Sequence, residues 1–479
     1  KYVHQNVGFE AIDAASGKFR ITNRFYFTNL KKYQIHYSVL SNNKTIKSGK
    51  VSLDIAPQAS KEFTVPVNGL KSQPGTEYFV NFSVTTVEPE PLIPAGYEIA
   101  YDQFQLPIQA EKRIYKANGP ALTTATSGDE LTVSSSKVNF VFNKKSGLVT
   151  SYKVDGTEYF KDGFGIQPNF WRAPNDNDYG NGAPKRLQVW KQSSKNFHVT
   201  DVKMTTENKV VSLKATYLLA AGNLYVVTYR IYPSGIVNVS AQFTSTDMQA
   251  AETEVSEATR MATFTPGSDA ARKAASKLEV PRIGVRFRLP AQMNNVQYFG
   301  RGPEENYIDR NHGTLVGVYK TTADKMYFNY VRPQENGHHT DTRWIALSPD
   351  KGNGLAIVAD SLIGFNALRN SIEDFDSEEA LPHPYQWSNF TPEEVANHNE
   401  KAARNVLRRM HHVNDITPRD FVEVCVDMKQ QGVGGYDSWG SRPEPIYQIP
   451  ANREYNWGFT LVPVRSPGQA NEAAKYDYR

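Results

Sequence analysis

The sequence predicts an all-β fold with at least two domains. Three observations carry this prediction: short runs in which apolar and polar residues alternate, turn-forming clusters between the runs, and a length of 479 residues, which exceeds what one hydrophobic core usually supports. Hydrophobic residues make up 39% of the chain and charged residues 22%, a balance typical of globular proteins. We therefore expect a chain built from β-sheets and rich in loops.

The first domain is predicted to be an immunoglobulin-like β-sandwich over residues 1–112. Alternating runs that predict strands occupy residues 19–21, 33–39, 51–55, 63–65 and 78–84. Clusters such as Ser41–Lys44 and Gln73–Gly75 separate the runs at the spacing expected of a sandwich. A Pro-rich stretch then precedes one more strand that ends near Leu106, and the polar residues 109–127 indicate a linker.

The second domain, residues 113–479, also begins with β-structure. Val138–Phe142 alternates into the turn Asn143–Gly147, and Asp155-Gly156 marks a tight hairpin. Further strands are predicted at residues 209–219, 223–232, 236–243, 283–289, 344–358 and 421–428.

Two segments of this domain depart from the β pattern. Residues 248–280 are rich in Ala, Glu and Lys and predict a loop insertion with a short helix, and residues 391–410 also predict a helix. The chain is expected to end in a polar C-terminal tail.

Composition excludes several classes of protein. The net charge is only +4 and no run of Lys and Arg follows the chain, so we expect no nucleic-acid partner. No stretch approaches the roughly 18 apolar residues of a membrane span, so we expect no membrane partner either. The single cysteine, Cys425, lies in a Phe-Val-Glu-Val-Cys-Val run typical of a buried strand. These features fit a soluble bacterial protein of the cytoplasm or periplasm, and the absence of an initiator Met predicts a fragment of a longer chain.

The segment Arg172–Gly180 concentrates short polar side chains between a proline and a glycine. Such a loop could bind a cation or sugar hydroxyls, but Asp176 and Asp178 share a side only if the chain is extended, and Gly180 does not fit the spacing of an EF-hand. A loop closed by its own Asx hydrogen bonds is the favoured interpretation, and metal binding is the alternative.

Two other motifs offer catalytic or metal-binding residue types. Glu304 and Glu305 are adjacent, whereas a retaining glycosidase needs two carboxyl groups facing each other across roughly 5–5.5 Å, so one buried, paired carboxylate and one solvated carboxylate are expected. His338 and His339 are consecutive and lack a third spaced ligand, so a structural or surface role is favoured over a metal site.

Trp439 lies in the glycine-flanked loop Gly434–Gly440, where a bulky side chain would be held near the surface. Sugars stack on such a platform, and Tyr436, Asp437 and Ser438 could supply polar contacts. A tryptophan that caps the core is the competing interpretation. Signatures of a Ser-His-Asp triad, a P-loop or a dinucleotide-binding fold are not apparent. The residues by themselves therefore predict a two-domain β protein with a candidate sugar platform.

Three segments carry a family resemblance: Phe299–Arg310 (FGRGPEENYIDR), Tyr330–Gly337 (YVRPQENG) and the Trp439 loop. In order and spacing they closely resemble the C-terminal part of glycoside hydrolase family two β-galactosidases. The segments that begin at Trp171, Pro281 and Val51 resemble the family too, so that the resemblance covers nearly the whole chain.

The resemblance implies a second immunoglobulin-like domain, the fourth of the family, followed by the fifth domain, a large β super-sandwich of the galactose-mutarotase-like small-chain type. The catalytic glutamates and the magnesium site of the family, with sodium as an additional candidate, lie on a preceding barrel. No catalytic residue, metal ligand or cofactor is therefore expected in this chain.

The resemblance also implies a substrate-binding role for Trp439, which matches a tryptophan that reaches into the mouth of the active site. Asp437 and Ser438 are weaker candidates beside it. Asn175, Asp176 and Gly180 match a loop near the same mouth, with Gly180 as a candidate hinge.

The expected whole protein is a retaining β-galactosidase that removes terminal non-reducing β-D-galactose residues. This chain would complete the wall of its active site, lack catalysis alone, and depend on the missing N-terminal domains. We expect a homo-oligomer at full length, with contacts that the 248–280 insertion could make or block. The alternatives are a stand-alone galactoside-binding module and a purely structural pair of domains.

Overall fold

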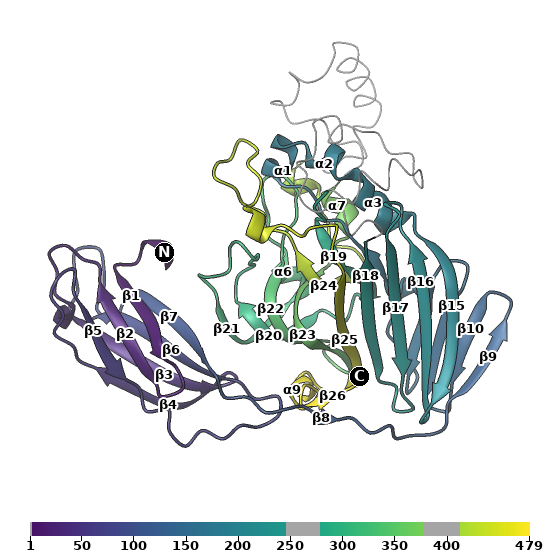
Figure 1. Cartoon of the computed structure of the whole chain (residues 1–479), viewed down its shortest axis with the longest axis horizontal. Helices are drawn as coiled ribbons and strands as arrows, with labels where there is room; N and C mark the ends of the chain where they lie inside the picture. Colours follow the sequence, from purple (N-terminus) through teal and green to yellow (C-terminus); the bar gives the residue numbers. More distant parts are fainter. Residues whose placement is uncertain (1, 246–277, 377–411) are drawn as a thin grey trace, which may run out of the picture.

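The computed structural model describes residues 2–245, 278–376 and 412–479 (Figure 1). The predicted all-β fold is confirmed: strands dominate, and the described helices are short. The predicted helix over residues 391–410 and residues 248–277 of the predicted insertion lie outside the described residues. Among the described residues, none of the helices has the length and apolar character that a membrane crossing requires.

The N-terminal domain consists of two antiparallel sheets (Figure 1). A three-stranded sheet has the order β1 (Val7–Asp13), β2 (Lys18–Asn23), β5 (Ser60–Thr64), and a four-stranded sheet has the order β4 (Lys44–Val51), β3 (Tyr33–Ser41), β6 (Tyr78–Thr86), β7 (Glu98–Leu106). Phe9 of β1 stacks on Phe82 of β6 with 4.6 Å between ring centroids, so the core lies between the two sheets. The alternation along β6 points its buried residues into this core, as the sequence predicts.

The predicted strand over residues 51–55 is wrong beyond Val51, where β4 ends. Ile55 is buried in the core, but its carbonyl oxygen accepts hydrogen bonds from the Asn23 side chain (3.1 Å) and from Leu30 N–H (3.1 Å) instead of joining a strand ladder. Burial of an apolar side chain therefore imitates a strand pattern here.

The C-terminal domain is built on a large sheet of many strands. A path of nine strands has the order β14 (Gln167–Asn169), β19 (Arg282–Pro290), β24 (Phe421–Gln430), β23 (Gly354–Leu368), β25 (Tyr455–Val464), β18 (Val237–Thr244), β17 (Leu224–Ile231), β16 (Val210–Leu218), β15 (His198–Glu207). Three more strands, β20 (Asn295–Gly302), β21 (Leu315–Thr322) and β22 (His339–Ser348), join this sheet beside β23, which makes twelve in all.

A second sheet has the order β13 (Thr157–Glu158), β12 (Leu148–Val154), β11 (Val138–Asn143), β10 (Glu130–Ser134), β9 (Thr123–Ser127). Phe140 of β11 packs against Tyr229 of β17 with 5.7 Å between ring centroids, so a shared core joins the two sheets as a sandwich. The predicted linker is wrong over residues 123–127, because these Thr-rich residues form the exposed edge strand β9.

Residues 344–358, predicted as one strand, belong to β22 and β23, which are separated by a turn over residues 349–353. The turn contains Pro349 and Gly352, residues that favour chain reversal. Strands β15, β20, β21 and β25 were not predicted, because their apolar patterns are short or interrupted.

Short helices connect these strands. The described helices are α1 (Asp176–Gly180), α2 (Ala183–Arg186), α3 (Gln188–Lys195), α6 (Ala323–Met326), α7 (Ile372–Phe375) and α9 (Gln469–Ala473). The single-turn 3₁₀ helices are η1 (Tyr2–His4), η2 (Leu30–Lys32), η3 (Lys161–Gly163), η6 (Val413–Asp415) and η7 (Pro445–Tyr447).

The polar C-terminal segment, predicted as a tail, is folded. Strand β26 (Tyr476–Asp477) pairs in parallel with β8 (Arg113–Ile114) of the segment that links the two domains. Tyr478 is buried, and its carbonyl oxygen accepts a hydrogen bond of 2.6 Å from the Tyr232 hydroxyl. The C-terminus thereby fastens the start of the second domain (Figure 1).

Direct contacts also join the two domains. The guanidinium of Arg343 makes two hydrogen bonds, 2.9 and 2.7 Å, to the carboxylate of Glu77. The side chain of Gln103 in β7 accepts a hydrogen bond from Val316 N–H (2.7 Å) and donates one to the Val316 carbonyl oxygen (2.9 Å). The side chain of Asn42 donates to that of Asn471 in α9 (3.0 Å).

Candidate functional site

The Trp439 loop, Gly434–Gly440, lies between β24 and η7. The side chains of Tyr436 and Trp439 are 85% and 71% exposed, so the interpretation of Trp439 as a core residue is wrong. The carboxylate of Asp437 accepts hydrogen bonds from the backbone N–H groups of Trp439 (2.8 Å) and Ser441 (3.4 Å). The bond from Trp439 is the main reason that the pKa of Asp437 lies below its ordinary value. Asp437 therefore shapes the turn that presents Trp439 at the surface.

The polar segment at residues 175–180 is a capped helix. The Asn175 side chain accepts a hydrogen bond from Asp178 N–H (2.8 Å), and the Asp178 carboxylate accepts one from Asn175 N–H (3.1 Å), which completes a capping box for α1. Both oxygens of Asp178 also accept hydrogen bonds of 3.0 Å from buried Arg172. The predicted Asx hydrogen bonds are present, but the prediction of a loop is wrong over Asp176–Gly180, where they cap a short helix.

The structure brings this helix against the Trp439 loop. The Asn177 side chain donates to the carbonyl oxygen of Asp437 (2.9 Å), and the Asn175 side chain donates to that of Val433 (2.9 Å). A Cβ atom built on Gly180 would lie 2.6 Å from Gly440 Cα and 2.8 Å from the carbonyl oxygen of Trp439. The candidate residues from the two motifs therefore form one continuous surface.

The motif Tyr330–Gly337 contributes a third edge. Arg332 lies 3.5 Å from the carboxylate of Asp176, and its guanidinium stacks on the ring of Tyr179 at 3.8 Å from the centroid. Val331 is 81% exposed beside it in sequence. The carboxylate of Asp176 is therefore paired with the guanidinium of Arg332 at the edge of this surface.

The motif Phe299–Arg310 supports the loop from below. The Asp309 carboxylate accepts a hydrogen bond of 2.8 Å from Gly434 N–H. The Glu305 side chain is 9% exposed and contacts Arg310 (2.7 Å), the hydroxyl of Tyr330 and Gly337 N–H (2.7 Å), whereas Glu304 is exposed. The prediction of one paired and one solvated carboxylate is confirmed.

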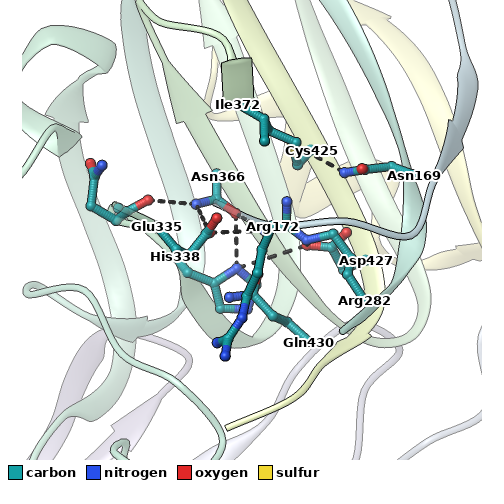
Figure 2. A network of polar contacts seen from close by, with 12 residues as sticks. Asn169, Arg172, Arg282, Glu335, His338, Asn366, Ile372, Cys425, Asp427 and Gln430 are labelled. Atoms are coloured by element: carbon teal, nitrogen blue, oxygen red, sulfur yellow. Dashed lines mark hydrogen bonds and ion pairs between the residues drawn. The ribbon is translucent and has the colours of Figure 1, made fainter. Parts of the chain in front are cut away.

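A buried polar network lies on the sheet at the base of these motifs (Figure 2). Arg282 of β19 is fully buried and contacts Glu335 (2.9 Å), Asn366 (2.9 Å) and Gln430, while Asp427 lies 3.2 Å from its Nε. Burial lowers the pKa of Arg282, but the negative charges of Asp427 and Glu335 outweigh this effect and hold the pKa above its ordinary value. Burial raises the pKa of Asp427 to about 7.

His338 and His339 are structural, as favoured from the sequence. His338 Nδ1 lies 2.9 Å from the Asn366 side chain, and the two ring nitrogens of His339 lie 3.1 Å from the carbonyl oxygen of Gly337 and 3.3 Å from that of Pro303, one of which accepts the single N–H of the neutral ring. Burial, together with the charge of Arg282, holds the pKa of His338 well below its ordinary value, and burial lowers that of His339 to about 4. Within the described residues, no group of three His, Cys, Asp or Glu side chains is arranged to hold a metal ion.

The network reaches the loops through the backbone. Arg172 donates to the carbonyl oxygen of Gln431 (3.3 Å), directly after β24, and Arg282 donates to that of Trp171 (3.4 Å). Sequence reasoning missed Arg172, Arg282 and Asp309 as supports. The signal for Arg282 was a segment, Val280–Leu289, in which arginines alternate with strand-forming apolar residues, because a charge buried on such a strand requires partners.

The sequence matches two family models. Residues 134–461 match the model described as beta galactosidase small chain, and residues 19–107 match beta-galactosidase, domain 4. The chain belongs to the β-galactosidase small-chain family. The two matches coincide with the second and first domains of the structure.

Curated relatives support the same membership. A β-galactosidase of Priestia megaterium is 32% identical over 97% of this chain, and one of Streptococcus thermophilus is 24% identical over 97% of it. The chain spans 39% of the length of each of these relatives. Among solved structures, a galactose 1-epimerase of Lactobacillus acidophilus aligns over 73% of this chain and 98% of the epimerase chain. The sequence identity is 8% and the TM-score is 0.34, so the structural similarity is low.

Proposed function

We propose that this chain is the C-terminal part of a retaining β-galactosidase that hydrolyses terminal non-reducing β-D-galactose residues. In this proposal, the preceding domains supply the catalytic carboxylates, and this chain completes the wall of the active site. The observation that carries the proposal is the interlocked surface on which the α1 segment and the Trp439 loop hold an exposed tryptophan.

Trp439 is the proposed substrate-binding residue. An exposed indole offers a flat apolar face for the C–H face of a pyranose, and polar groups beside it orient the hydroxyls. Asp437, Ser438, Asn175 and Asp176 are the weaker proposed contacts. Because the Asp437 carboxylate already accepts two backbone hydrogen bonds, its main contribution is to the shape of the loop.

The chain alone is proposed to be catalytically inactive. The adjacent Glu304 and Glu305 do not form a facing pair, since Glu305 is engaged by Arg310, Tyr330 and Gly337. Magnesium, with sodium as an additional candidate, is assigned in this proposal to the missing barrel, and no residue of this chain is proposed as a ligand. A homo-oligomer at full length is part of the same proposal.

The test is hydrolysis of a chromogenic β-galactoside by the 479-residue chain, with and without an N-terminal half that bears the barrel. We expect no turnover by the chain alone and activity after mixing. Turnover by the chain alone would contradict the proposal, and so would mixing that yields a stable complex without activity.

Variants of the mixed enzyme test the role of Trp439. Trp439→Ala should raise the KM for the β-galactoside at least roughly tenfold, the effect of losing about 1.5 kcal/mol of aromatic contact. The matched control is Tyr26→Ala, because Tyr26 is 75% exposed on the other domain. Equal KM values for the two variants would remove Trp439 from the site.

A stand-alone galactoside-binding module is the second candidate, favoured by the exposure of Tyr436 and Trp439 in the absence of a facing carboxylate pair at Glu304 and Glu305. It predicts tight, saturable binding of lactose to the isolated chain, abolished by Trp439→Ala. The pocket-wall proposal predicts weak binding at this surface until the barrel is added.

A further inference from the structure

A cavity of about 420 Å³ lies where the N-terminal domain meets the super-sandwich. One wall comes from the segment before β6, from the end of β7 and from the linker that carries Lys112. The other wall comes from β20, β22 and β23, with Phe299, Trp344 and Asp360 among its residues. The cavity has the size of a small-molecule site, and junctions between domains are common places for such sites. It shares no residue with the surface around Trp439.

Part of the lining is rigid and electrically neutral. Glu77 and Arg343 form a two-bond ion pair across the domain boundary, and Gln105 donates a further hydrogen bond of 2.8 Å to Glu77. The guanidinium of Arg343 also lies 5.3 Å from the ring centroid of Phe299. These groups satisfy one another and leave little capacity for a ligand.

Lys112 and Asp360 are different. The ammonium of Lys112 donates to the carbonyl oxygen of Ala359 (3.0 Å), although much of this side chain is exposed, and burial of the charged end lowers its pKa. The Asp360 carboxylate accepts a long hydrogen bond of 3.5 Å from Asn238, and burial raises its pKa. Among the described residues no direct ion pair joins these two side chains, although the charge of each affects the pKa of the other.

The cavity therefore presents one ammonium with donors to spare and one carboxylate with acceptors to spare. An anionic ligand would meet Asp360, and a cationic ligand would meet Lys112. A hydroxyl group suits both, since it accepts from an ammonium and donates to a carboxylate. Leu362 lines the same cavity and is 49% exposed, so it offers an apolar surface for C–H groups.

We propose that this cavity is a second carbohydrate site, which binds a neutral sugar through hydroxyl contacts to Lys112 and Asp360. The site is separate from the proposed catalytic mouth and requires no chemistry, so it does not depend on the proposed hydrolysis. Because both domains contribute to its walls, an occupied site also favours the docked arrangement of the two domains.

The experiment is calorimetric titration of D-galactose into the 479-residue chain carrying Trp439→Ala, so that the surface around Trp439 does not contribute. We expect weak, saturable binding. On this background, Lys112→Met and Asp360→Asn should each weaken binding at least roughly tenfold, the effect of losing a hydrogen bond to a charged group. Leu362→Trp should weaken binding by narrowing the cavity.

The matched control is Lys116→Met, which removes an exposed lysine of the same linker that does not line the cavity. It should leave the Kd unchanged. Equal Kd values for the Lys112 and Lys116 variants, or no binding of galactose to the Trp439→Ala chain, would overturn the proposal. Tighter binding of zwitterionic L-serine than of galactose would overturn the assignment to a sugar. Thermal unfolding midpoints identify any variant that has lost its fold. If the Lys112 variant is unfolded, the Kd values of the Asp360 and Leu362 variants test the proposed site without it.

Discussion

At Gly180 the backbone of one motif lies against the backbone of another. The sequence suggests a hinge, but the structure gives an additional reason for a glycine: any Cβ atom would enter the space of Gly440 and of the Trp439 carbonyl oxygen. Both contacts are with backbone, which cannot move aside as a side chain does. The absence of a side chain therefore sets the distance between α1 and the Trp439 loop.

Gly180→Ala should push the two segments apart. We expect a loss of about 1–3 kcal/mol in the free energy of unfolding, the usual effect of overpacking, and a higher KM in the mixed enzyme at nearly unchanged kcat. Denaturant unfolding and steady-state kinetics measure these quantities. Gly468→Ala is the control, because nothing lies within 4 Å of a Cβ at that position. A KM equal to that of the control would mean that the spacing of the loops does not matter for substrate.

His339 links stability to pH. Burial lowers its pKa to about 4 in the folded chain, whereas an unfolded histidine titrates near 6.5. The neutral form is therefore favoured by folding, and this contribution is fully present above pH 6.5 and is lost as the pH falls towards 4. Within this window the unfolded chain binds the proton more readily than the folded chain.

Replacing His339 should flatten part of this dependence. We expect the wild-type chain to lose up to about 3 kcal/mol more than His339→Gln in the free energy of unfolding between pH 7 and pH 4. Urea titrations at several pH values check this difference. His198→Gln, which changes an exposed histidine, should follow the wild type. A profile for His339→Gln that is parallel to the wild type would contradict the assignment.

At the scale of elements, the Trp439 loop is long and has no regular secondary structure, yet it is anchored at several backbone positions. Asn177 donates to the carbonyl oxygen of Asp437, and Asp309 accepts from Gly434 N–H. Directly before the loop, Arg172 and Asn175 donate to the carbonyl oxygens of Gln431 and Val433. One oxygen of Asp309 is buried and finds no hydrogen-bond partner among the described residues. Because Asp309 is the acceptor for Gly434 N–H, its loss leaves that group without this partner.

Asp309→Ala should loosen the loop without unfolding the sheet. We expect the amide of Gly434 to exchange roughly tenfold to a hundredfold faster, equivalent to about 1–3 kcal/mol of local stability. Hydrogen exchange of peptides that span residues 431–443 measures the effect. Asp309→Asn, which retains one oxygen, should restore part of the protection, whereas Glu304→Gln changes an exposed carboxylate of the same motif and should have no effect. Unchanged exchange in Asp309→Ala would show that the other anchors suffice.

At the scale of the molecule, the C-terminus closes the structure. Strand β26 pairs with β8 in the linker, the Tyr478 hydroxyl donates to the carbonyl oxygen of Ala473 (3.0 Å), and the ring of Tyr478 packs 5.0 Å from that of Tyr115. The last residues thus hold the linker against the super-sandwich, and α9 reaches the N-terminal domain through Asn471.

Tyr478→Ala should release this closure. We expect the free energy of unfolding to fall by roughly 3 kcal/mol or more, because a buried aromatic side chain is removed. We also expect trypsin to cleave faster after Lys116 in the linker. A proteolysis time course compares the variant with Tyr26→Ala, which removes an exposed tyrosine. Cleavage at the same rate in both variants would mean that the linker is held by other contacts.

The sequence by itself determined the all-β class, most strands of the N-terminal sandwich and the family, whereas it left the surface position of Trp439 as one of two alternatives. These features depend on local patterns: alternation places one face of a strand in the core, and glycine-flanked polar segments favour loops. The pairing of Glu305 and the structural character of His338 and His339 also followed from the spacing of adjacent residues, which cannot converge on one point.

Only the tertiary structure decided which motifs meet. Arg172 and Asp178 are close in sequence, but Asn177 and Asp437 are 260 positions apart, and Gly180 and Gly440 come together where the chain after β24 bonds to Asn175. The cavity between Lys112 and Asp360 also depends on how the two domains dock. Local periodicity carries no information about such distant contacts, since they are set by the order of strands in the sheet and by the packing of side chains across it.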